Sequence, residues 1–138
     1  KKVNNYVEKI FLKNKNNSRS LYNEFIILGS LNFHKTNIEL NNVHFEKISS
    51  EDAINIINSH LELRNTKISN TFGEDAMNLV NSNSFLDNLT IANVPSDGVD
   101  IDFGTLEFSK IVCNNIGNDC LDTSGANIKG DILSGDNV

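Results

Sequence analysis

Four decapeptides recur along this chain at nearly constant spacing, and this repeat constrains the fold more strongly than any other feature. Each decapeptide has an aspartate at its third position, and successive aspartates are separated by 23, 22 and 22 residues. The segments are 50–59, 73–82, 95–104 and 117–126, and the shared aspartates are Asp52, Asp75, Asp97 and Asp119. A period of this length is the sequence signature of a solenoid, in which each repeat packs against its neighbours.

Each repeat contains three short patches in which apolar and other residues alternate. After Asp97 these patches are Val99-x-Ile101, Leu106-x-Phe108 and Ile111-x-Cys113. A period of two predicts strands with one buried face, and the Asn, Ser, Gly and Asp residues between the patches are typical of turns. Three brief strands per repeat predict one coil of a parallel β-helix. A leucine-rich repeat has a similar length, but it has one strand per repeat and a Leu/Asn frame that this sequence lacks.

Composition and charge exclude several classes of protein. Apolar residues make up 38% of the 138 residues, and no run approaches the roughly 18 consecutive apolar residues of a membrane span. The net charge is −6, and residues 25–138 alone carry a balance of −10, so we expect this part of the chain not to bind nucleic acid. The 24 asparagines indicate either an AT-rich coding sequence or a fold that uses asparagine in tight turns.

The two ends of the chain depart from the repeat. Residues 1–24 have a basic balance of +4, and we interpret them as an N-terminal cap or leader before a parallel β-helix over residues 25–138. Within this leader, the apolar spacing over residues 3–13 predicts a short capping helix, with an irregular strand as the alternative. Residues 25–33 are expected to form a degenerate first coil. No polar cap follows the last repeat, which predicts a fragment of a longer solenoid or end-to-end self-association.

Stacking converts each repeated residue into a column at about 4.8 Å spacing. The four shared aspartates form one column at a turn, where Asp52 and Asp75 are predicted to accept backbone hydrogen bonds. A second column is expected to face outward from the following strand, and its members are Asn55, Asn78, Asp100 and Asp122, with Asp102 just beyond. The second column is therefore amide in two coils and acidic in the next two.

This concentration of carboxylates is the candidate site. We expect Asn55, Asn78, Asp100, Asp102 and Asp122 to form a binding surface. Carboxylate oxygens are also the ligands that Ca²⁺ prefers, and pairs of carboxylates serve as acid and base in glycosidases. The candidate metal ligands and the candidate catalytic residues are the same four, Asp97, Asp100, Asp119 and Asp122. Solvated or turn-bound carboxylates are the remaining alternative.

Two further sets of residues have structural interpretations. Cys113 and Cys120 are seven residues apart and suit small buried positions, and a disulfide across the turn is an open alternative. Six phenylalanines are expected to stack in the core, with an exposed sugar-stacking surface as the alternative; they are Phe33, Phe45, Phe72, Phe85, Phe103 and Phe108.

The coil pattern over residues 25–138 resembles the right-handed parallel β-helix superfamily, which includes pectate lyases and polygalacturonases. Residues 117–125, Gly-Asn-Asp-Cys-Leu-Asp-Thr-Ser-Gly, are similar to the Asp-Asp-Cys-(apolar)-x-x-x-Ser-Gly segment of polygalacturonase-like glycosidases. In that family both aspartates at the start of the segment are catalytic, and here only Asp119 matches because Asn118 occupies the other position. The family's Gly-His-Gly and Arg-x-Lys motifs are absent. The resemblance implies right-handed coils and a secreted carbohydrate context, like that of uncharacterised bacterial β-helix proteins.

We therefore expect an all-β, right-handed parallel β-helix of about four to five coils. The leading functional hypothesis is a non-catalytic domain of a secreted or cell-surface protein that binds a polysaccharide or protein partner through an acidic face, with Ca²⁺ as an optional ligand. The first residues lack a signal-peptide cleavage site, so any such signal has already been removed. The alternatives are a polysaccharide hydrolase or lyase, and a structural spacer that assembles end to end.

Overall fold

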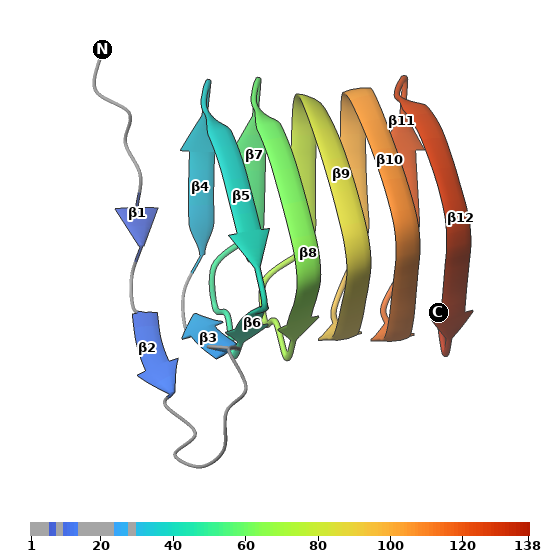
Figure 1. Cartoon of the computed structure of the whole chain (residues 1–138). Coiled ribbons are helices and arrows are strands. Elements are labelled where there is room, and N and C mark those ends of the chain that lie inside the picture. Colours follow the sequence, from blue (N-terminus) through green and yellow to red (C-terminus); the bar gives the residue numbers. More distant parts are fainter. Residues whose placement is uncertain (1–5, 8–9, 14–23, 28–29) are drawn as a thin grey trace.

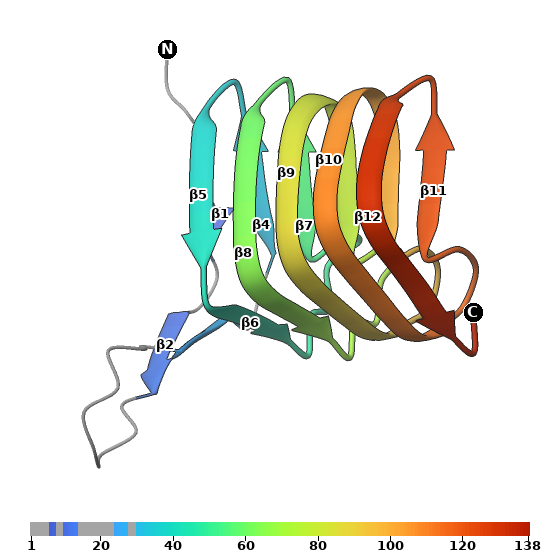
Figure 2. The ribbon, with the colours of Figure 1, turned by 45° about the vertical axis from the view of Figure 1, so that its right-hand side comes forward.

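A computed structural model of the protein, which describes residues 6–7, 10–13, 24–27 and 30–138, shows a parallel β-solenoid of about five turns (Figure 1). Its strands belong to one twelve-stranded sheet that wraps around the solenoid, and the described residues contain no helix. Successive coils lie side by side in chain order (Figure 2). The parallel β-helix predicted from the repeat is therefore confirmed. Among the described residues, no helix has the length and apolar character needed to cross a membrane.

The strands become longer and more continuous along the solenoid. In the third and fourth coils, one bent strand covers all the faces that separate strands cover in the first coil. By coil, the strands are β4 (Leu31–His34), β5 (Asn37–Asn41) and β6 (Val43–Glu46); β7 (Ile54–Ile57) and β8 (His60–Ser69); β9 (Met77–Val94); β10 (Val99–Ile116); and β11 (Leu121–Ser124) and β12 (Asn127–Asp136).

The strand register reproduces the spacing of the sequence repeat. Ile54 pairs with Met77, Met77 with Val99, and Val99 with Leu121, all in parallel. The sequence separation between equivalent residues of successive coils changes from 23 to 22 at the turn that precedes the aspartate column. That turn has four residues between Asn70 and Asp75, but three between Asn93 and Asp97. The difference in length is therefore confined to one turn, and the paired strands stay in register.

The inward positions of the strands form one continuous core. Ile54, Met77 and Val99 are fully buried, as the alternation predicted, whereas the equivalent residue of the last coil, Leu121, is half-buried. The expectation for the phenylalanines was only partly right. Phe45 and Phe108 are in the core and Phe33 and Phe85 are half-buried, whereas Phe72 and Phe103 are 67% and 59% exposed.

The corners of the coils depend on left-handed backbone conformations. Among the residues that the structure describes, twelve non-glycine residues have positive φ, and nine of them are asparagine. Asparagine tolerates this conformation better than most residues because its short polar side chain can form local hydrogen bonds. These turn positions account for a large part of the asparagine excess in the sequence.

The corner asparagines also bind one another from coil to coil. In the longest ladder, each Nδ2 donates to the Oδ1 of the asparagine one coil earlier. The distances are 2.8 Å from Asn93 to Asn70, 2.9 Å from Asn115 to Asn93 and 2.7 Å from Asn137 to Asn115. Shorter ladders join Asn81 to Asn58 at 2.7 Å and Asn88 to Asn65 at 3.1 Å. The ladders hold neighbouring coils in register at their corners.

The N-terminal segment forms strands, so the capping helix predicted within residues 3–13 is wrong. β1 (Tyr6–Val7) pairs antiparallel with β4, and β2 (Ile10–Lys13) pairs antiparallel with β3 (Glu24–Ile27), which itself runs parallel to β6. Residues 3–5 and 8–9 lie outside the described residues. The physical reason is the unpaired backbone edge of the first coil, which is satisfied by another strand and not by a helix.

Replacing a central asparagine of the ladder should separate two contributions to the free energy of unfolding, one from its hydrogen bonds and one from its backbone conformation. Asn93→Ala removes two side-chain hydrogen bonds and places a Cβ-bearing residue without a local polar partner at φ 57°. We expect it to lower the free energy of unfolding by about 2–3 kcal/mol, measured by urea denaturation. Asn93→Gly loses the same bonds but adopts the conformation readily, so its loss should be smaller. Wild-type stability in both variants would contradict this role of the ladder.

Candidate functional site

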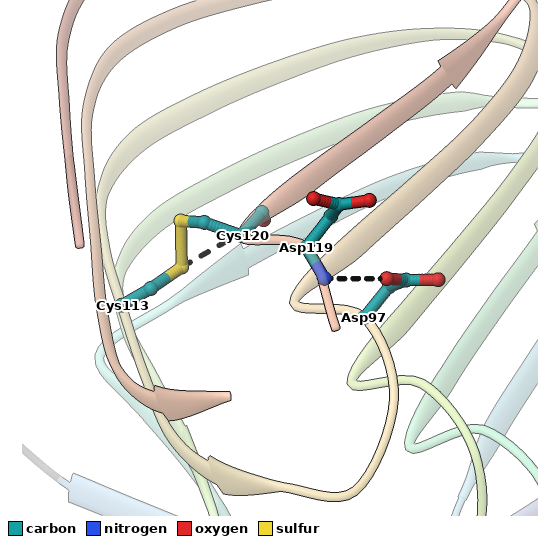
Figure 3. Close-up of a disulfide and its surroundings, with 4 residues drawn as sticks. All are labelled: Asp97, Cys113, Asp119 and Cys120. Atoms are coloured by element: carbon teal, nitrogen blue, oxygen red, sulfur yellow. Dashed lines mark hydrogen bonds between the residues drawn. A yellow bond between two sulfur atoms is a disulfide. The ribbon is translucent and has the colours of Figure 1, made fainter. Parts of the chain in front are cut away.

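The aspartate column at the turn bridges successive coils. Asp52, Asp75 and Asp97 are each only 8% exposed. Asp75 Oδ1 accepts a hydrogen bond from the Asp97 backbone N–H at 2.9 Å, and Asp97 Oδ1 accepts one from the Asp119 N–H at 2.8 Å (Figure 3). Asn118 Nδ2 also donates to Asp97 Oδ1, at 3.0 Å. Asp75 thus has the turn-forming role that the sequence predicts, and Asp97 uses one carboxylate oxygen in the same way.

Asp52 begins this column in an environment that disfavours its charge. Burial, and next the charge of Asp75, raise the pKa of Asp52 from 3.8 to about 6. Hydrogen bonds from the Asn78 side chain and the Asp75 backbone oppose this shift by stabilising the carboxylate. The carboxyl of Asp52 is therefore held between an amide of the outward column and the next turn.

The second column has the predicted register. Asn55 pairs with Asn78, Asn78 with Asp100, and Asp100 with Asp122, on four adjacent parallel strands. A neighbouring column lies two residues further along each strand, and its side chains change from apolar in the second and third coils to acidic or polar in the fourth and fifth. Its members are Ile57, Val80, Asp102 and Ser124. The face formed by β7, β9, β10 and β11 is thus amide and apolar in the second and third coils but acidic in the fourth and fifth.

Partial burial and the neighbouring carboxylates raise the proton affinity of Asp100. The pKa of Asp100 increases from 3.8 to about 6, first because the group is partly buried and then because of the charges of Asp102, Asp75, Asp122 and Asp97. Ion pairs in the described part of the chain involve Glu62, Asp87 and Glu107 and leave these carboxylates unpaired. The acidic face therefore carries negative charge that no described cation neutralises.

The acidic residues are arranged as a strip and not as a cage. Asp97 is buried in the turn, whereas Asp119 and Asp122 are exposed and Asp100 and Asp102 are half-exposed. Among the residues that the structure describes, no group of three or more His, Cys, Asp or Glu side chains is arranged to hold a metal ion. What this arrangement offers is a row of hydrogen-bond acceptors with a net negative charge.

A disulfide fixes the coil that carries Asp119 and Asp122. Cys113, three residues before the end of β10, is bonded to Cys120, immediately after Asp119, and their Cα atoms are 5.7 Å apart (Figure 3). Room for this bond comes from Gly98, because a Cβ there would lie 3.1 Å from Cys113 Sγ and 2.7 Å from the Cys120 carbonyl oxygen. Alanine occupies the equivalent position in the two previous coils, at Ala53 and Ala76. The disulfide, which the sequence left open, is therefore present.

A shallow groove lies at the corner that follows this face. It has a volume of about 440 Å³, and its walls come from the first three coils and include Lys35, Thr36, Asn58, Ser59, His60 and Asn81. In the fourth coil, Phe103 occupies the position equivalent to Asn58 and Asn81. Sequence reasoning missed this corner; the signal that marks it is the replacement of a repeated asparagine by an aromatic residue.

Comparison with known proteins adds no family to this description. No protein-family model, curated protein or solved structure matches the chain. The functional argument therefore depends on the geometry and chemistry of the residues themselves.

Replacing Asp100 by asparagine should stabilise the protein at neutral pH. Because its pKa is higher in the folded state (about 6) than its ordinary value of 3.8, the stability linked to this proton is present below about pH 4 and lost as the pH rises to about 6. We expect Asp100→Asn to raise the free energy of unfolding at neutral pH by about 1 kcal/mol, after allowance for solvent screening. Urea denaturation across this pH range should give a flatter profile for the variant.

The control for this experiment is Asp131→Asn, which changes an exposed carboxyl on β12. It should leave both the stability and the pH profile close to those of the wild type. A less stable Asp100→Asn variant at neutral pH would show that the carboxylate of Asp100 is stabilised by its surroundings and would contradict the charge argument.

Reducing the disulfide should weaken the last coils. The bond closes a loop with a sequence separation of seven residues, for which loop entropy predicts a loss of about 2–3 kcal/mol when the bond is removed. The measurement is urea denaturation of the Cys113→Ala/Cys120→Ala variant, beside the wild type with and without dithiothreitol. The reductant should shift the midpoint of the wild type and leave that of the variant unchanged. An unchanged wild-type midpoint would contradict the prediction.

Proposed function

We propose that this chain is a non-catalytic β-helix binding domain whose acidic face binds a polyhydroxylated ligand, namely a neutral glycan. The observation that carries the proposal is the in-register pair of Asp100 and Asp122, with Asp102 two residues further along β10, and without a neutralising cation among the described residues. Carboxylate oxygens accept strong, charge-assisted hydrogen bonds from hydroxyl groups. The same charge repels anionic polymers, so the preferred ligand is uncharged.

The disulfide supports a location outside the cytosol. Disulfides persist in secreted, periplasmic and surface proteins and are rare in reducing compartments. The bond between Cys113 and Cys120 therefore favours a secreted or cell-surface protein. That location also agrees with a ligand drawn from extracellular polysaccharide.

A second candidate function is that of a polysaccharide hydrolase, which the resemblance to pectate-lyase-like enzymes suggests. The observation in its favour is the raised pKa of Asp100 beside other carboxylates, because glycosidases use one protonated and one ionised carboxyl. Against it, Asp97 binds the next turn through one carboxylate oxygen, and Asn118 replaces one aspartate of the family segment. We therefore favour binding without turnover.

Calorimetric titration with matched neutral and anionic oligosaccharides tests the proposal. Cellohexaose and xylohexaose should bind at least about tenfold more tightly than hexagalacturonate, a difference of about 1.4 kcal/mol. Asp100→Ala/Asp122→Ala should lower affinity for the neutral sugars by about fivefold or more through loss of the acceptors. Glu107→Ala changes a carboxylate that pairs with Lys129 on the adjacent face and should have no effect.

Four outcomes would contradict the proposal. Equal binding of hexagalacturonate would show that the charge of the face is irrelevant, and full binding by Asp100→Ala/Asp122→Ala would place the ligand elsewhere. Release of reducing sugar ends during incubation would identify a hydrolase. If no glycan binds, a structural spacer that self-associates end to end becomes the better interpretation, and the oligomeric state tests it.

A further inference from the structure

Phe103 is held in a backbone conformation that its side chain disfavours. Its φ is +61°, a value that is a genuine outlier for a bulky residue and that strains the backbone. The side chain is also 59% exposed, so most of its apolar surface is in contact with water. Strained residues of this kind concentrate at functional sites, where the surrounding structure maintains them.

Asparagine fits this corner with less backbone strain than phenylalanine, and it occupies the equivalent position in two earlier coils. At the equivalent corner of the two previous coils stand Asn58 and Asn81, both with positive φ and joined by a 2.7 Å hydrogen bond. Phe103 follows Asn81 in the same column and ends this ladder. Compared with asparagine, phenylalanine at this corner gives up the ladder hydrogen bond, adds strain and exposes apolar surface. Stability therefore does not explain its presence.

The coil after Phe103 leaves room for the ring. Gly125 has a φ of +67°, and a Cβ placed on it would lie 2.9 Å from Phe103 Cδ1. One edge of the ring thus lies against a glycine, and the side chain as a whole is 59% exposed. Phe72, by contrast, is equally exposed on another turn without positive φ, which makes it a matched control.

On its other side, Phe103 adjoins the polar groove. Asn81 lines the groove and neighbours Phe103 in the corner column. Thr105, two residues after Phe103, donates a hydrogen bond to the groove residue Asn83 at 2.8 Å. None of the lining residues that the structure describes is acidic or apolar. The corner therefore combines one exposed aromatic ring with a row of amides and hydroxyls, an imidazole and the ammonium group of Lys35.

This combination matches the chemistry of a sugar. A pyranose presents a face of C–H bonds, which packs against an aromatic ring, and a rim of hydroxyl groups, which both donate and accept hydrogen bonds. Amides offer both functions in one side chain. An extended peptide would need pockets for its alternate side chains, and none of the described lining residues offers an apolar surface.

We propose that this corner is a saccharide-binding site in which Phe103 is the stacking surface and Asn58, Asn81 and His60 form hydrogen bonds with sugar hydroxyls. The proposal rests on the proposed function for its ligand class, a neutral glycan. It assigns a separate set of residues from Asp100 and Asp122, so the two can be tested independently.

The test is calorimetric titration of the full chain with cellohexaose, xylohexaose and chitohexaose. Phe103→Asn should lower affinity at least about tenfold, which corresponds to the stacking contribution of about 1.4 kcal/mol. The same variant should be as stable as the wild type or more stable, because an amide can extend the ladder to Asn81. Phe103→Tyr keeps the ring and should retain binding, and Phe72→Asn should leave binding unchanged.

Each other outcome overturns the assignment. Wild-type affinity in Phe103→Asn would remove Phe103 from the site, and a clear loss of stability in that variant would show that the ring serves the fold. Binding lost in Asp100→Ala/Asp122→Ala but retained in Phe103→Asn would leave the acidic face as the site and reject the corner; the reverse pattern would reject the acidic face. If no sugar binds at millimolar concentration, both assignments fail.

Discussion

The structure depends on backbone turns that only a few residue types can make, and on the hydrogen bonds between those turns. Asparagine at the corners adopts positive φ and donates to the asparagine one coil earlier, so one residue type both bends the chain and aligns the coils. Once the corners are aligned, the parallel strands between them have only one register. The continuous core and the outward columns both follow from that register.

The register also decides which aspartates remain available for a ligand. Asp75 and Asp97 each direct a carboxylate oxygen to the backbone of the next turn, so part of the negative charge serves the stacking itself. Asp100 and Asp122 lie on the strands, where the equivalent residues of earlier coils are amides. A substitution of Asn by Asp at these positions changes the electrostatic character of the face without changing the coil.

The sequence was sufficient to predict the fold, because each repeat shows again the length of a coil and the residues that face inward. The steps between Asp52, Asp75, Asp97 and Asp119 gave the coil length, and the alternation after each gave the inward residues. Prediction failed where a single residue departs from its pattern. The alternation predicts that Phe103 faces inward, but the chain turns at this residue because its φ is positive. Phenylalanine rarely adopts this conformation, so the sequence does not indicate it. For the N-terminal segment, the apolar spacing favoured a helix over the alternative of an irregular strand, whereas the open edge of the first coil favours strands.

In the candidate site too, the features that follow the repeat were predictable, and those that depend on individual residues were not. The column of Asn55, Asn78, Asp100 and Asp122 was predictable, because it depends on the repeat alone. The groove was not, since it is assembled from three coils and from residues that share no motif, such as Lys35 and His60. The disulfide between Cys113 and Cys120 required the distance across a turn, which spacing in the sequence does not provide.

The turn before the aspartate column differs in length between coils, with four residues after Asn70 and three after Asn93, while the strands on both sides stay paired. Length variation at this edge of the solenoid is therefore uncoupled from the packing of the core. Such a position accepts inserted segments, since surface loops tolerate them when the flanking elements are fixed. A lineage that elongates this turn would acquire a new row of loops along one edge, displayed at the coil spacing, on an unchanged scaffold.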